Sequence, residues 1–338
     1  MPASPGPKER GGKSIESDCL ATASMLFMDI KQIKYFLAVA ESGGFSKAAQ
    51  IIHVTQPALS AHVARLEEEL GVQLFTRSAK GIELTHAGEV LVDHAHDILR
   101  RVKHAQDAVR HVADEVHGEV ALGLPTTVAM VLTLPLLTQV RAQWPHISLR
   151  LVEGHSGWLQ EWLLAGRIDA AVLFGTAAHK GLKVQPVLDE DLYLVSAPHS
   201  PSVSGTDAIA MRDAAQCELI VPAKEHGLRI AIDRAALQAD VDLNVKVEID
   251  SFASMKKAVA QGLGHTILSW AAVAEEIERG ELVARRIVQP KVSRSVVYAV
   301  RDEHLVNRAQ TAVNQLVKQE ITQLVNSGRW RADLRIQD

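Results

Sequence analysis

The sequence predicts a multidomain α+β protein, in which a small helical domain with a hairpin is joined by one long helix to a larger α/β part. Three observations lead to this prediction. The chain has 338 residues, which at roughly 150 residues per domain corresponds to two or three domains. Short amphipathic helices begin at Met28, and from about residue 118 onward predicted strands alternate with predicted helices.

The composition is that of an ordinary globular protein, with 47% hydrophobic and 22% charged residues. The longest apolar runs are well short of the roughly 20 residues of a membrane span, so we expect no membrane partner. Cys19 and Cys217, the two cysteines, fit a reducing, cytoplasmic location and offer no metal-ligand spacing. The net charge of −4 gives no general signal for nucleic acid. We expect no cofactor and no metal.

Residues 1–27 are rich in Pro, Gly and Ser and show no periodicity, so we predict a disordered extension. A secretory signal is the alternative, because the apolar segment CLATASMLF follows Lys8, Arg10 and Lys13. That segment carries no cleavage-like motif and runs directly into a periodic helix, which argues against a signal. Met28 is a candidate for the natural first residue, as is Met1.

Residues 28–52 predict two short helices. Apolar residues repeat at helical spacing up to the Gly43-Gly44 pair, and the same spacing resumes directly after it. Glycine favours a break between helices, and Ser46 is the expected cap of the second helix. A three-residue turn follows, which is the spacing typical of a helix-turn-helix.

A third helix is predicted over residues 56–70, with Thr55 as its N-cap and Pro57 in its first turn, where the missing N–H costs little. Its apolar residues form one stripe that we expect to be buried: Leu59, Val63, Leu66 and Leu70. A hairpin over residues 73–85 follows. Three helices, a short turn and a hairpin together predict a winged helix-turn-helix over residues 28–85.

The third helix leaves a mainly polar surface beside its buried stripe, at Gln56, Pro57, Ser60, Ala61, Ala64 and Arg65. Gln and Ser suit base edges in a major groove, and Arg65 suits a phosphate or a guanine. However, residues 28–88 hold six Lys or Arg and six Asp or Glu, so this domain has no net basic footprint. On these residues alone, a winged helix that binds protein rather than DNA stays open.

The segment FLAVAESGGFSKAAQIIHVTQPALSAHVARLEEELGVQLFTRSAKGIELTHAG resembles the N-terminal domain of LysR-type transcriptional regulators. The motifs GFSKAA, TQPALS, LEEELG, LFTR and LTHAG occur in the order and at the spacing of that family. The resemblance covers about residues 28–323. The segment LRLVEGHSGWLQEWLLAGRIDAAVL is most similar to a subgroup linked to nitrogen assimilation or to organic acids.

This resemblance implies that the chain binds DNA, with Gln56, Ser60 and Ala61 facing the major groove and Arg77 reaching the DNA backbone from the wing. Ala61 departs from a residue that is commonly basic in the family, and the neighbouring His62 is placed to substitute for it in part. The predicted DNA-contacting residues are Ser46, Lys47, Thr55, Gln56, Pro57, Ser60, Ala61, His62, Arg65, Arg77 and Lys80.

Residues 86–117 predict a long helix that dimerises, and the family resemblance implies a linker helix here. Apolar residues at alternating spacings of four and three form a heptad seam. The seam comprises Leu91, Ala95, Ile98, Val102, Ala105, Val109, Val112 and Val116. The histidines at positions 94, 96, 104, 111 and 117 look like a metal tract. None pairs with another at i, i+4 on the seam, so we assign them to a solvated face.

Residues 118–325 alternate strands and helices. Two consecutive βα runs are joined near residue 196 and rejoined by a strand at 295–300, which indicates two doubly wound subdomains. We define subdomain I as residues 118–195 plus 292–325, subdomain II as 196–291, and 326–338 as a tail. The family resemblance implies a periplasmic-binding-protein-like effector-binding domain. The predicted strands are 119–124, 147–153, 168–174, 192–197, 218–221, 244–249, 265–268 and 295–300, and the predicted helices are 127–143, 157–166, 228–239 and 252–261.

Ligands of doubly wound sheets bind beyond the carboxyl ends of the strands, which locates a candidate effector cleft. Two predicted helices begin there beside Thr126 and Ser156, and a helix N-terminus suits an anion. The alternative is that both hydroxyls only cap their helices. The predicted effector-contacting residues are Thr126, Thr127, His155, Ser156, Phe174, Thr176, His226 and Phe252.

The polarity of these loops predicts a small carboxylate effector. Residues 125–128 and 154–157 contain no Asp or Glu, so nothing in them repels an anion. Phe174, Phe252 and Trp270 are expected to wall an apolar portion of the ligand. A neutral or cationic effector is the alternative.

The sequence excludes the usual enzyme classes. Glu153, His155 and Ser156 are neighbours in the chain and cannot supply the geometry of a catalytic triad. A Gly-x-Ser-x-Gly elbow, a phosphate loop and an HExxH motif are absent. We therefore predict a transcriptional regulator that binds promoter DNA as a homodimer or homotetramer, with RNA polymerase as a further candidate partner. A solute-binding protein, suggested by the C-terminal half alone, is the alternative, and the helix-turn-helix argues against it.

Overall fold

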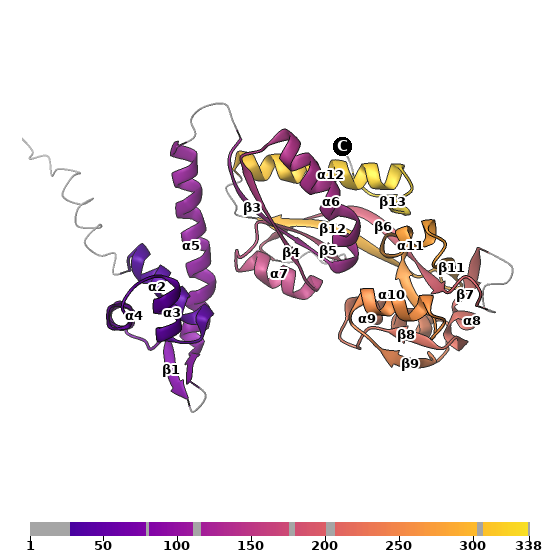
Figure 1. Cartoon of the computed structure of the whole chain (residues 1–338), viewed down its shortest axis with the longest axis horizontal. Helices are drawn as coiled ribbons and strands as arrows, with labels where there is room; N and C mark the ends of the chain where they lie inside the picture. The colour runs from indigo at the N-terminus through magenta and orange to yellow at the C-terminus, as the bar shows by residue number, and fades with distance from the viewer. Residues whose placement is uncertain are drawn as a thin grey trace, which may run out of the picture. The chain divides into compact units, whose positions relative to one another are not determined.

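The computed structural model describes residues 28–78, 81–110, 116–175, 180–200, 207–302 and 307–336. Several predicted features lie outside the described residues: the extension at 1–27, Lys80, Val112, Thr176, and the side chains of Arg77 and Val109. The chain divides at residues 102 and 103 into two compact units, both drawn in Figure 1. No described helix is both long and apolar enough to cross a membrane.

The first unit has the predicted winged helix-turn-helix fold. Its first helix starts with a capping box, in which Asp29 accepts the Gln32 N–H at 2.6 Å and the Gln32 side chain accepts the Asp29 N–H at 2.7 Å. Two clusters of apolar side chains, around Phe36 and Leu59, fill the space between the helices. The elements are α2 (Ile30–Ser42), α3 (Phe45–Ile51), α4 (Gln56–Leu70), β1 (Phe75–Ser78) and β2 (Gly81–Leu84).

Two details of this unit correct the sequence analysis. Helix α3 begins at Phe45 with Gly44 as its N-cap, so Ser46 lies within the helix and does not cap it. Leu70 is 38% exposed rather than buried. It is the last residue of α4, and the left-handed backbone of Gly71 then turns the chain away from the helix axis.

Helix α5 (His86–Arg110) corresponds to the predicted linker helix, but the first part of its seam is occupied within the same chain. Leu91, Ala95 and Ile98 pack against the core of the winged helix, and Ala95 is fully buried there. These side chains hold α5 onto its own domain. Leu91 and Ile98 are only partly buried, so they keep surface that a partner helix could cover, and their place in the seam stays a prediction.

The last residue of the predicted seam, Val116, is not helical. It lies within the second unit, just before β3, and packs partly buried against the core of that unit, so its assignment to the seam is wrong. Among the described side chains of the seam, half-buried Val102 and exposed Ala105 belong to neither hydrophobic core and are the most accessible to a partner helix.

The second unit is built on a mixed sheet with strand order β4-β3-β5-β12-β6-β11-β7, and β10 and β13 also pair with β6. Strand β6 (Leu182–Ser196) serves both subdomains, because its first part pairs with β12 and its last part pairs with β10 and β11. The predicted strand at 192–197 is only the end of this element. Its earlier part was not predicted, because the acidic run Asp189-Glu190-Asp191 in its middle interrupts the apolar pattern of a strand.

In subdomain I, helices α6 and α12 lie side by side on one face of the sheet and α7 covers the other (Figure 1). Alternate residues of β3 face these two layers: Val120 and Leu122 point to one and Ala121 to the other. The elements are β3 (Gly118–Leu124), α6 (Thr126–Gln143), β4 (Ile147–Glu153), α7 (Ser156–Leu164), β5 (Ala170–Phe174), β12 (Ser293–Arg301) and α12 (Arg308–Asn326).

Subdomain II has its own hydrophobic core around Leu194, Ile220 and Ile232. Its predicted strands and helices are present with ends shifted by one or two residues, and several short elements were not predicted. The elements are β7 (Ala208–Ala210), α8 (Met211–Gln216), β8 (Leu219–Val221), α9 (Gly227–Gln238), β9 (Val245–Glu248), α10 (Phe252–Ala260), β10 (Thr266–Ser269), the short 3-10 helix η2 (Trp270–Ala272), α11 (Ala274–Glu278) and β11 (Val283–Val288).

The predicted tail at 326–338 is wrong as far as residue 336. Residues after α12 form strand β13 (Ala332–Leu334), which pairs with β6 next to Leu188–Glu190. The Trp330 side chain is fully buried in the core of subdomain I. The sequence did carry a signal for this strand, which the sequence analysis missed: Trp330, Ala332, Leu334 and Ile336 alternate with charged residues, the period of a half-buried strand.

Candidate functional site

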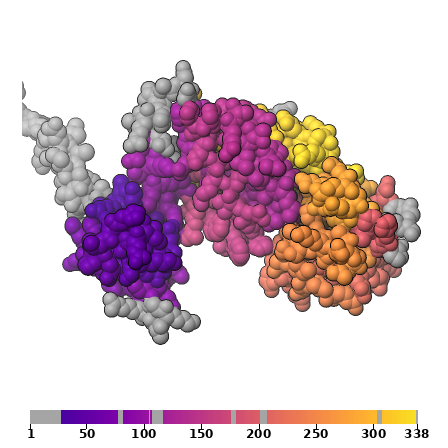
Figure 2. All heavy atoms as spheres, viewed as in Figure 1, coloured from indigo at the N-terminus to yellow at the C-terminus, as the bar shows by residue number. Residues whose placement is uncertain are grey.

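A cleft of about 680 Å³ lies between the two subdomains of the α/β unit. From subdomain I, the carboxyl ends of β3, β4 and β5 and the starts of α6 and α7 reach it, and from subdomain II the starts of α9 and α10 reach it. In Figure 2 the two subdomains are adjoining masses, one mainly magenta and the other mainly orange. The cleft is thus at the position that the strand ends predicted.

The structure brings seven of the eight predicted effector-contacting residues to this one cleft; the eighth, Thr176, lies outside the described residues. The seven are Thr126, Thr127, His155, Ser156, Phe174, His226 and Phe252. Trp270 does not line the cleft. Its ring is stacked under the Arg331 guanidinium at 3.3 Å and meets Tyr193 edge-on, so the expectation that it walls the ligand is wrong.

The two helix starts of subdomain I that line the cleft, those of α6 and α7, have no side-chain caps. The N-cap residues are Pro125 for α6 and His155 for α7, and neither forms a side-chain cap. The Ser156 hydroxyl instead accepts the Phe174 backbone N–H at 3.0 Å, which ties α7 to the end of β5. The hydroxyls of Thr126 and Ser156 therefore do not consume the N–H groups of the first turns, and these ends keep their preference for an anion.

Arg294 is the main cleft residue that sequence reasoning missed. Its side chain is 8% exposed, yet it lines the cleft. Nη2 donates to Thr127 Oγ1 at 3.0 Å and to Ser269 Oγ at 3.4 Å, and the guanidinium lies 3.6 Å from the centre of the Phe174 ring. Nη1 has no partner among the described residues. Arg294 directly precedes the predicted strand 295–300, and nothing in the sequence marks it as buried or as close to the cleft.

Glu190 forms a buried ion pair with Arg294. Arg294 Nε donates to Glu190 Oε1 at 2.6 Å, and the two residues lie opposite each other on β12 and β6. The carboxylate is 1% exposed. A buried arginine needs such a partner, since an unpaired charge in this environment is strongly unfavourable.

Two histidines meet across the cleft. The His155 ring at the start of α7 and the His226 ring at the start of α9 stand edge-to-face with centroids 4.8 Å apart, and Phe252 packs on the other side of His226. His226 Nδ1 accepts the Leu228 N–H at 3.0 Å, which caps α9 and leaves Nε2 as the donor. Burial, with His155 and Arg294 nearby, lowers the pKa of His226 to about 4. His226 is therefore a neutral hydrogen-bond donor at neutral pH.

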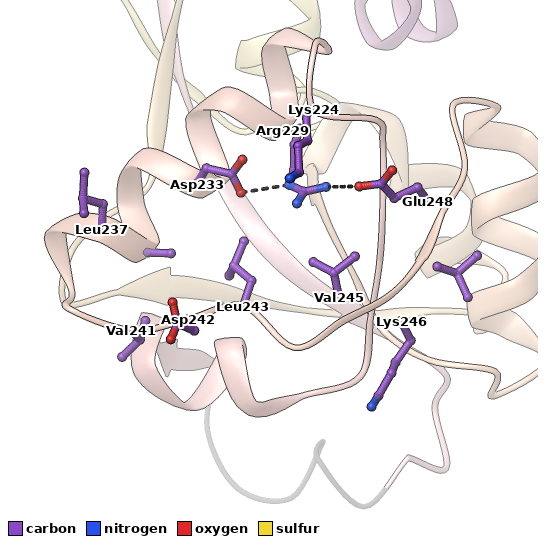
Figure 3. Close-up of a pocket in the computed structure, with 12 residues that line it drawn as sticks. Lys224, Arg229, Asp233, Leu237, Val241, Asp242, Leu243, Val245, Lys246 and Glu248 are labelled. Carbon is purple, nitrogen blue, oxygen red and sulfur yellow. Dashed lines mark hydrogen bonds and ion pairs between the residues drawn. The ribbon is translucent and has the colours of Figure 1, made fainter.

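A second, open groove of about 670 Å³ lies in subdomain II between α9 and β9 (Figure 3). Arg229 at its base is buried like Arg294, but it is bonded on both sides, to Asp233 at 2.8 Å and to Glu248 at 2.9 Å. Its third bond is to the Pro222 carbonyl. Because two carboxylates already neutralise Arg229, this groove offers less to an anion than the cleft does.

The described residues offer little to catalysis or metal binding. No cluster of three or more His, Cys, Asp or Glu residues suited to a metal occurs among them. Cys217 is half-buried, and burial raises the pKa of its thiol, which makes it a poor nucleophile at neutral pH.

In the winged helix, most of the predicted DNA-contacting side chains lie at the surface. On α4 and the preceding turn, five of these residues are exposed and two are half-buried: Thr55, Gln56, Pro57, Ala61 and Arg65 are exposed, and Ser60 and His62 are half-buried. Ser46 and Lys47 are exposed on α3. Arg65 pairs with Glu69 at 2.8 Å, and the His62 ring packs edge-on against Tyr35. Arg65 must break its ion pair with Glu69, and His62 its ring contact with Tyr35, before either side chain can contact DNA.

Both units match known families. Residues 30–89 match the family model "Bacterial regulatory helix-turn-helix protein, lysR family" and residues 113–321 match "LysR substrate binding domain". The chain is 34% identical to the nitrogen assimilation regulatory protein nac of Klebsiella aerogenes, over 80% of this chain and 87% of that protein. It is 33% identical to the nac protein of Escherichia coli K12, over 90% and 99%.

Solved structures agree with this fold. A full-length OxyR variant from Pseudomonas aeruginosa has a TM-score of 0.70 at 23% identity, covering 92% of this chain and 99% of that one. Full-length CbnR, in complex with its target DNA, has a TM-score of 0.63 at 25% identity, covering 88% and 99%. The predicted fold class, with its N-terminal helix-turn-helix and C-terminal ligand-binding domain, is confirmed.

Proposed function

This chain belongs to the LysR family of bacterial DNA-binding transcriptional regulators, and we propose that its regulatory ligand is a small carboxylate bound in the cleft between the two subdomains. In this proposal the carboxylate lies at Arg294 and the uncapped starts of α6 and α7. Phe174 and Phe252 wall the apolar portion, and His226 donates from subdomain II.

The observation that carries this proposal is the free Nη1 edge of Arg294. Its side chain is more than nine-tenths buried and lines the cleft, and Glu190 and Thr127 fix its other nitrogens. A planar guanidinium with one unoccupied edge is a strong hydrogen-bond donor to a carboxylate oxygen. The uncapped helix ends add N–H groups with the same preference for an anion.

A thermal-shift screen of the full-length chain tests the proposal. The panel contains acetate, benzoate, succinate and 2-oxoglutarate, each beside its uncharged amide. A ligand that binds only the folded state raises its stability by RT ln(1 + [L]/Kd). We expect at least one carboxylate, and none of the amides, to raise the melting temperature. Equal shifts for a carboxylate and its amide would favour a neutral effector.

Matched variants locate the binding. Arg294→Gln is expected to remove the shift, whereas Arg229→Gln, which alters an equally buried arginine in the other groove, is expected to keep it. Thr127→Val and Ser156→Ala should also weaken the ligand response while DNA affinity stays within a factor of a few, because the predicted DNA contacts lie in the other unit. Loss of the shift in Arg229→Gln but not in Arg294→Gln would move the site to that groove.

On the DNA side, we propose that the surface of α4 reads promoter DNA and that the chain acts as a cytoplasmic homodimer or homotetramer. RNA polymerase is the proposed partner at the promoter. A gel shift on the DNA upstream of the protein's own gene, repeated at several salt concentrations, tests this. Affinity should fall steeply with salt as phosphate contacts are lost. Binding that does not depend on DNA sequence would favour a winged helix without a promoter-reading role.

A further inference from the structure

The segment that follows α12 reaches the back of the proposed effector site. Trp330 is fully buried, and its backbone N–H donates to the Leu324 carbonyl at 2.9 Å. The next residue, Arg331, stacks on the Trp270 ring of η2, and β13 then pairs with β6 so that Ala332 lies opposite Glu190. The position of Trp330 is thus fixed from both sides along the chain.

The Trp330 indole donates from Nε1 to Glu190 Oε2 at 2.7 Å. The other oxygen of the same carboxylate, Oε1, accepts from Arg294 Nε. Each oxygen of Glu190 therefore has one strong donor, and the carboxylate is held between the C-terminal segment and the arginine of the cleft. With both partners in place, its plane has little freedom to rotate.

We infer that Trp330 is a positioning residue of the effector site: through Glu190 it fixes the Arg294 guanidinium so that the Nη1 edge stays open to the ligand. This inference rests on the proposed carboxylate site. It extends that site to the C-terminal segment, which does not line the cleft.

The chemistry of an arginine–carboxylate pair explains why Trp330 is needed. If the indole N–H is removed, Glu190 Oε2 is left buried without a donor, which is costly. The carboxylate can then rotate and accept from both Nε and Nη2 of Arg294, the side-on geometry that such pairs prefer. Nη2 would leave Thr127, and the guanidinium would turn away from the position in which its free edge meets a ligand.

A pair of variants separates this role from simple packing. Trp330→Phe keeps an aromatic ring in the core but removes the N–H. Trp144→Phe is the control, because Trp144 packs partly buried against the same core and its indole hydrogen-bonds to none of the described residues. Glu190→Gln is the second variant, because it replaces one acceptor oxygen with an NH2 group, which would face the N–H of either Trp330 or Arg294.

The ligand-free readout is the crystal structure of the full-length Trp330→Phe protein. We expect Arg294 to pair side-on with Glu190 and to lose its bond to Thr127. If this variant does not fold, the structure of Glu190→Gln is used, and a displaced Arg294 is again expected. An Arg294 side chain that keeps the wild-type bonds in the variant would overturn the inference.

The second readout is calorimetric affinity for the carboxylate, among acetate, benzoate, succinate and 2-oxoglutarate, that binds the wild type most tightly. We expect the affinity to fall at least tenfold in Trp330→Phe and in Glu190→Gln, and to stay within twofold in Trp144→Phe. Equal losses in both tryptophan variants would overturn the inference in favour of packing. If none of the four binds the wild type, the proposed function fails, while the position of Arg294 in the variant crystal still decides the inference.

Discussion

At the scale of single residues, the cleft and its wall contain buried charged and polar groups, Arg294, Glu190 and Thr127, that are tolerated there because they bond to one another. Arg294 is buried against the Phe174 ring, and its charge is tolerated because Glu190 pairs with it and Thr127 accepts from it. A buried pair of this kind contributes little net stability, but the loss of one partner costs about 3–5 kcal/mol. We therefore interpret it as serving binding more than stability.

His226 gives a prediction at this scale, because its pKa is lowered from 6.5 to about 4 in the folded chain. The unfolded chain binds the proton more readily, so folded stability is fully present above about pH 6.5 and is lost as the pH falls toward 4. His226→Asn keeps a side-chain acceptor at the N-cap and removes the titration. Between pH 7 and pH 4.5 the wild type should lose about 1–2 kcal/mol more stability than this variant, an amount reduced for solvent screening.

Urea unfolding of both proteins at a series of pH values measures this difference. Parallel stability curves for the two proteins would show that His226 does not titrate in this window. A wild type that becomes relatively more stable on acidification would reverse the sign and show that the folded chain prefers protonated His226.

At the scale of elements, helix α4 is predicted to read sequence and the wing to bind the backbone. Gln56→Ala and Ser60→Ala should each weaken specific binding by roughly 1–3 kcal/mol and change nonspecific affinity little. Arg77→Ala should weaken binding to all sequences alike and flatten the salt dependence. Competition gel shifts with specific and scrambled DNA measure both effects. An unchanged sequence preference in Gln56→Ala would show that α4 is not the reading helix.

Helix α5 gives a prediction about assembly. Because Leu91, Ala95 and Ile98 are held by the winged-helix core, we expect a partner helix to meet the seam further along, at Val102 and Ala105. The double variant Val102→Glu, Ala105→Glu places like charges in that contact and should dissociate the dimer. Gln106→Glu, at an exposed position off the seam, is the control. Sedimentation velocity distinguishes the outcomes, and a double variant that sediments like the wild type would rule out this seam.

Elements with a clean period could be predicted from the sequence, and those shaped by distant contacts could not. The winged helix, α6, α7, α9 and α10 follow from apolar spacing and helix-start signals. The full length of β6 could not be predicted, because Asp189, Glu190 and Asp191 interrupt its apolar pattern. In the folded chain, each of these acidic side chains pairs with a residue at the start of β12 or just before it. The strand after Trp330 was overlooked although apolar and charged residues alternate over 329–336, but its partner β6 and the burial of Trp330 follow only from the completed sheet.

The candidate site shows the same division. Loop residues at strand ends, such as Thr126, Ser156 and His226, could be located because the topology rule for doubly wound sheets places them. Arg294 could not, since it lies at the start of a strand, and its approach to the cleft depends on the pairing of β12 with β6. A rule based on strand ends does not find a residue at the junction of two subdomains.

At the scale of the whole molecule, the chain combines a DNA-reading unit with a ligand-binding unit. The cleft between the subdomains is lined by the start of β12, at Ser293, Arg294 and Ser295, so an anion at the proposed site would contact this strand. We expect the two subdomains to exchange between arrangements, and a ligand in the cleft between them can bias this equilibrium. A ligand shifts such an equilibrium only by its differential affinity for the two states. Arg294, anchored on β12, is the residue through which we expect that difference to arise.

Calorimetric titration of the full-length protein and of Arg294→Gln tests most directly whether a carboxylate binds at Arg294. The titrants are the carboxylate that gives the largest thermal shift and its own amide. We predict one carboxylate site per chain in the wild type, at least tenfold weaker binding in Arg294→Gln, and little binding of the amide to either protein. Equal affinity of the wild type and Arg294→Gln for the carboxylate, or equal affinity of the wild type for carboxylate and amide, would contradict the account.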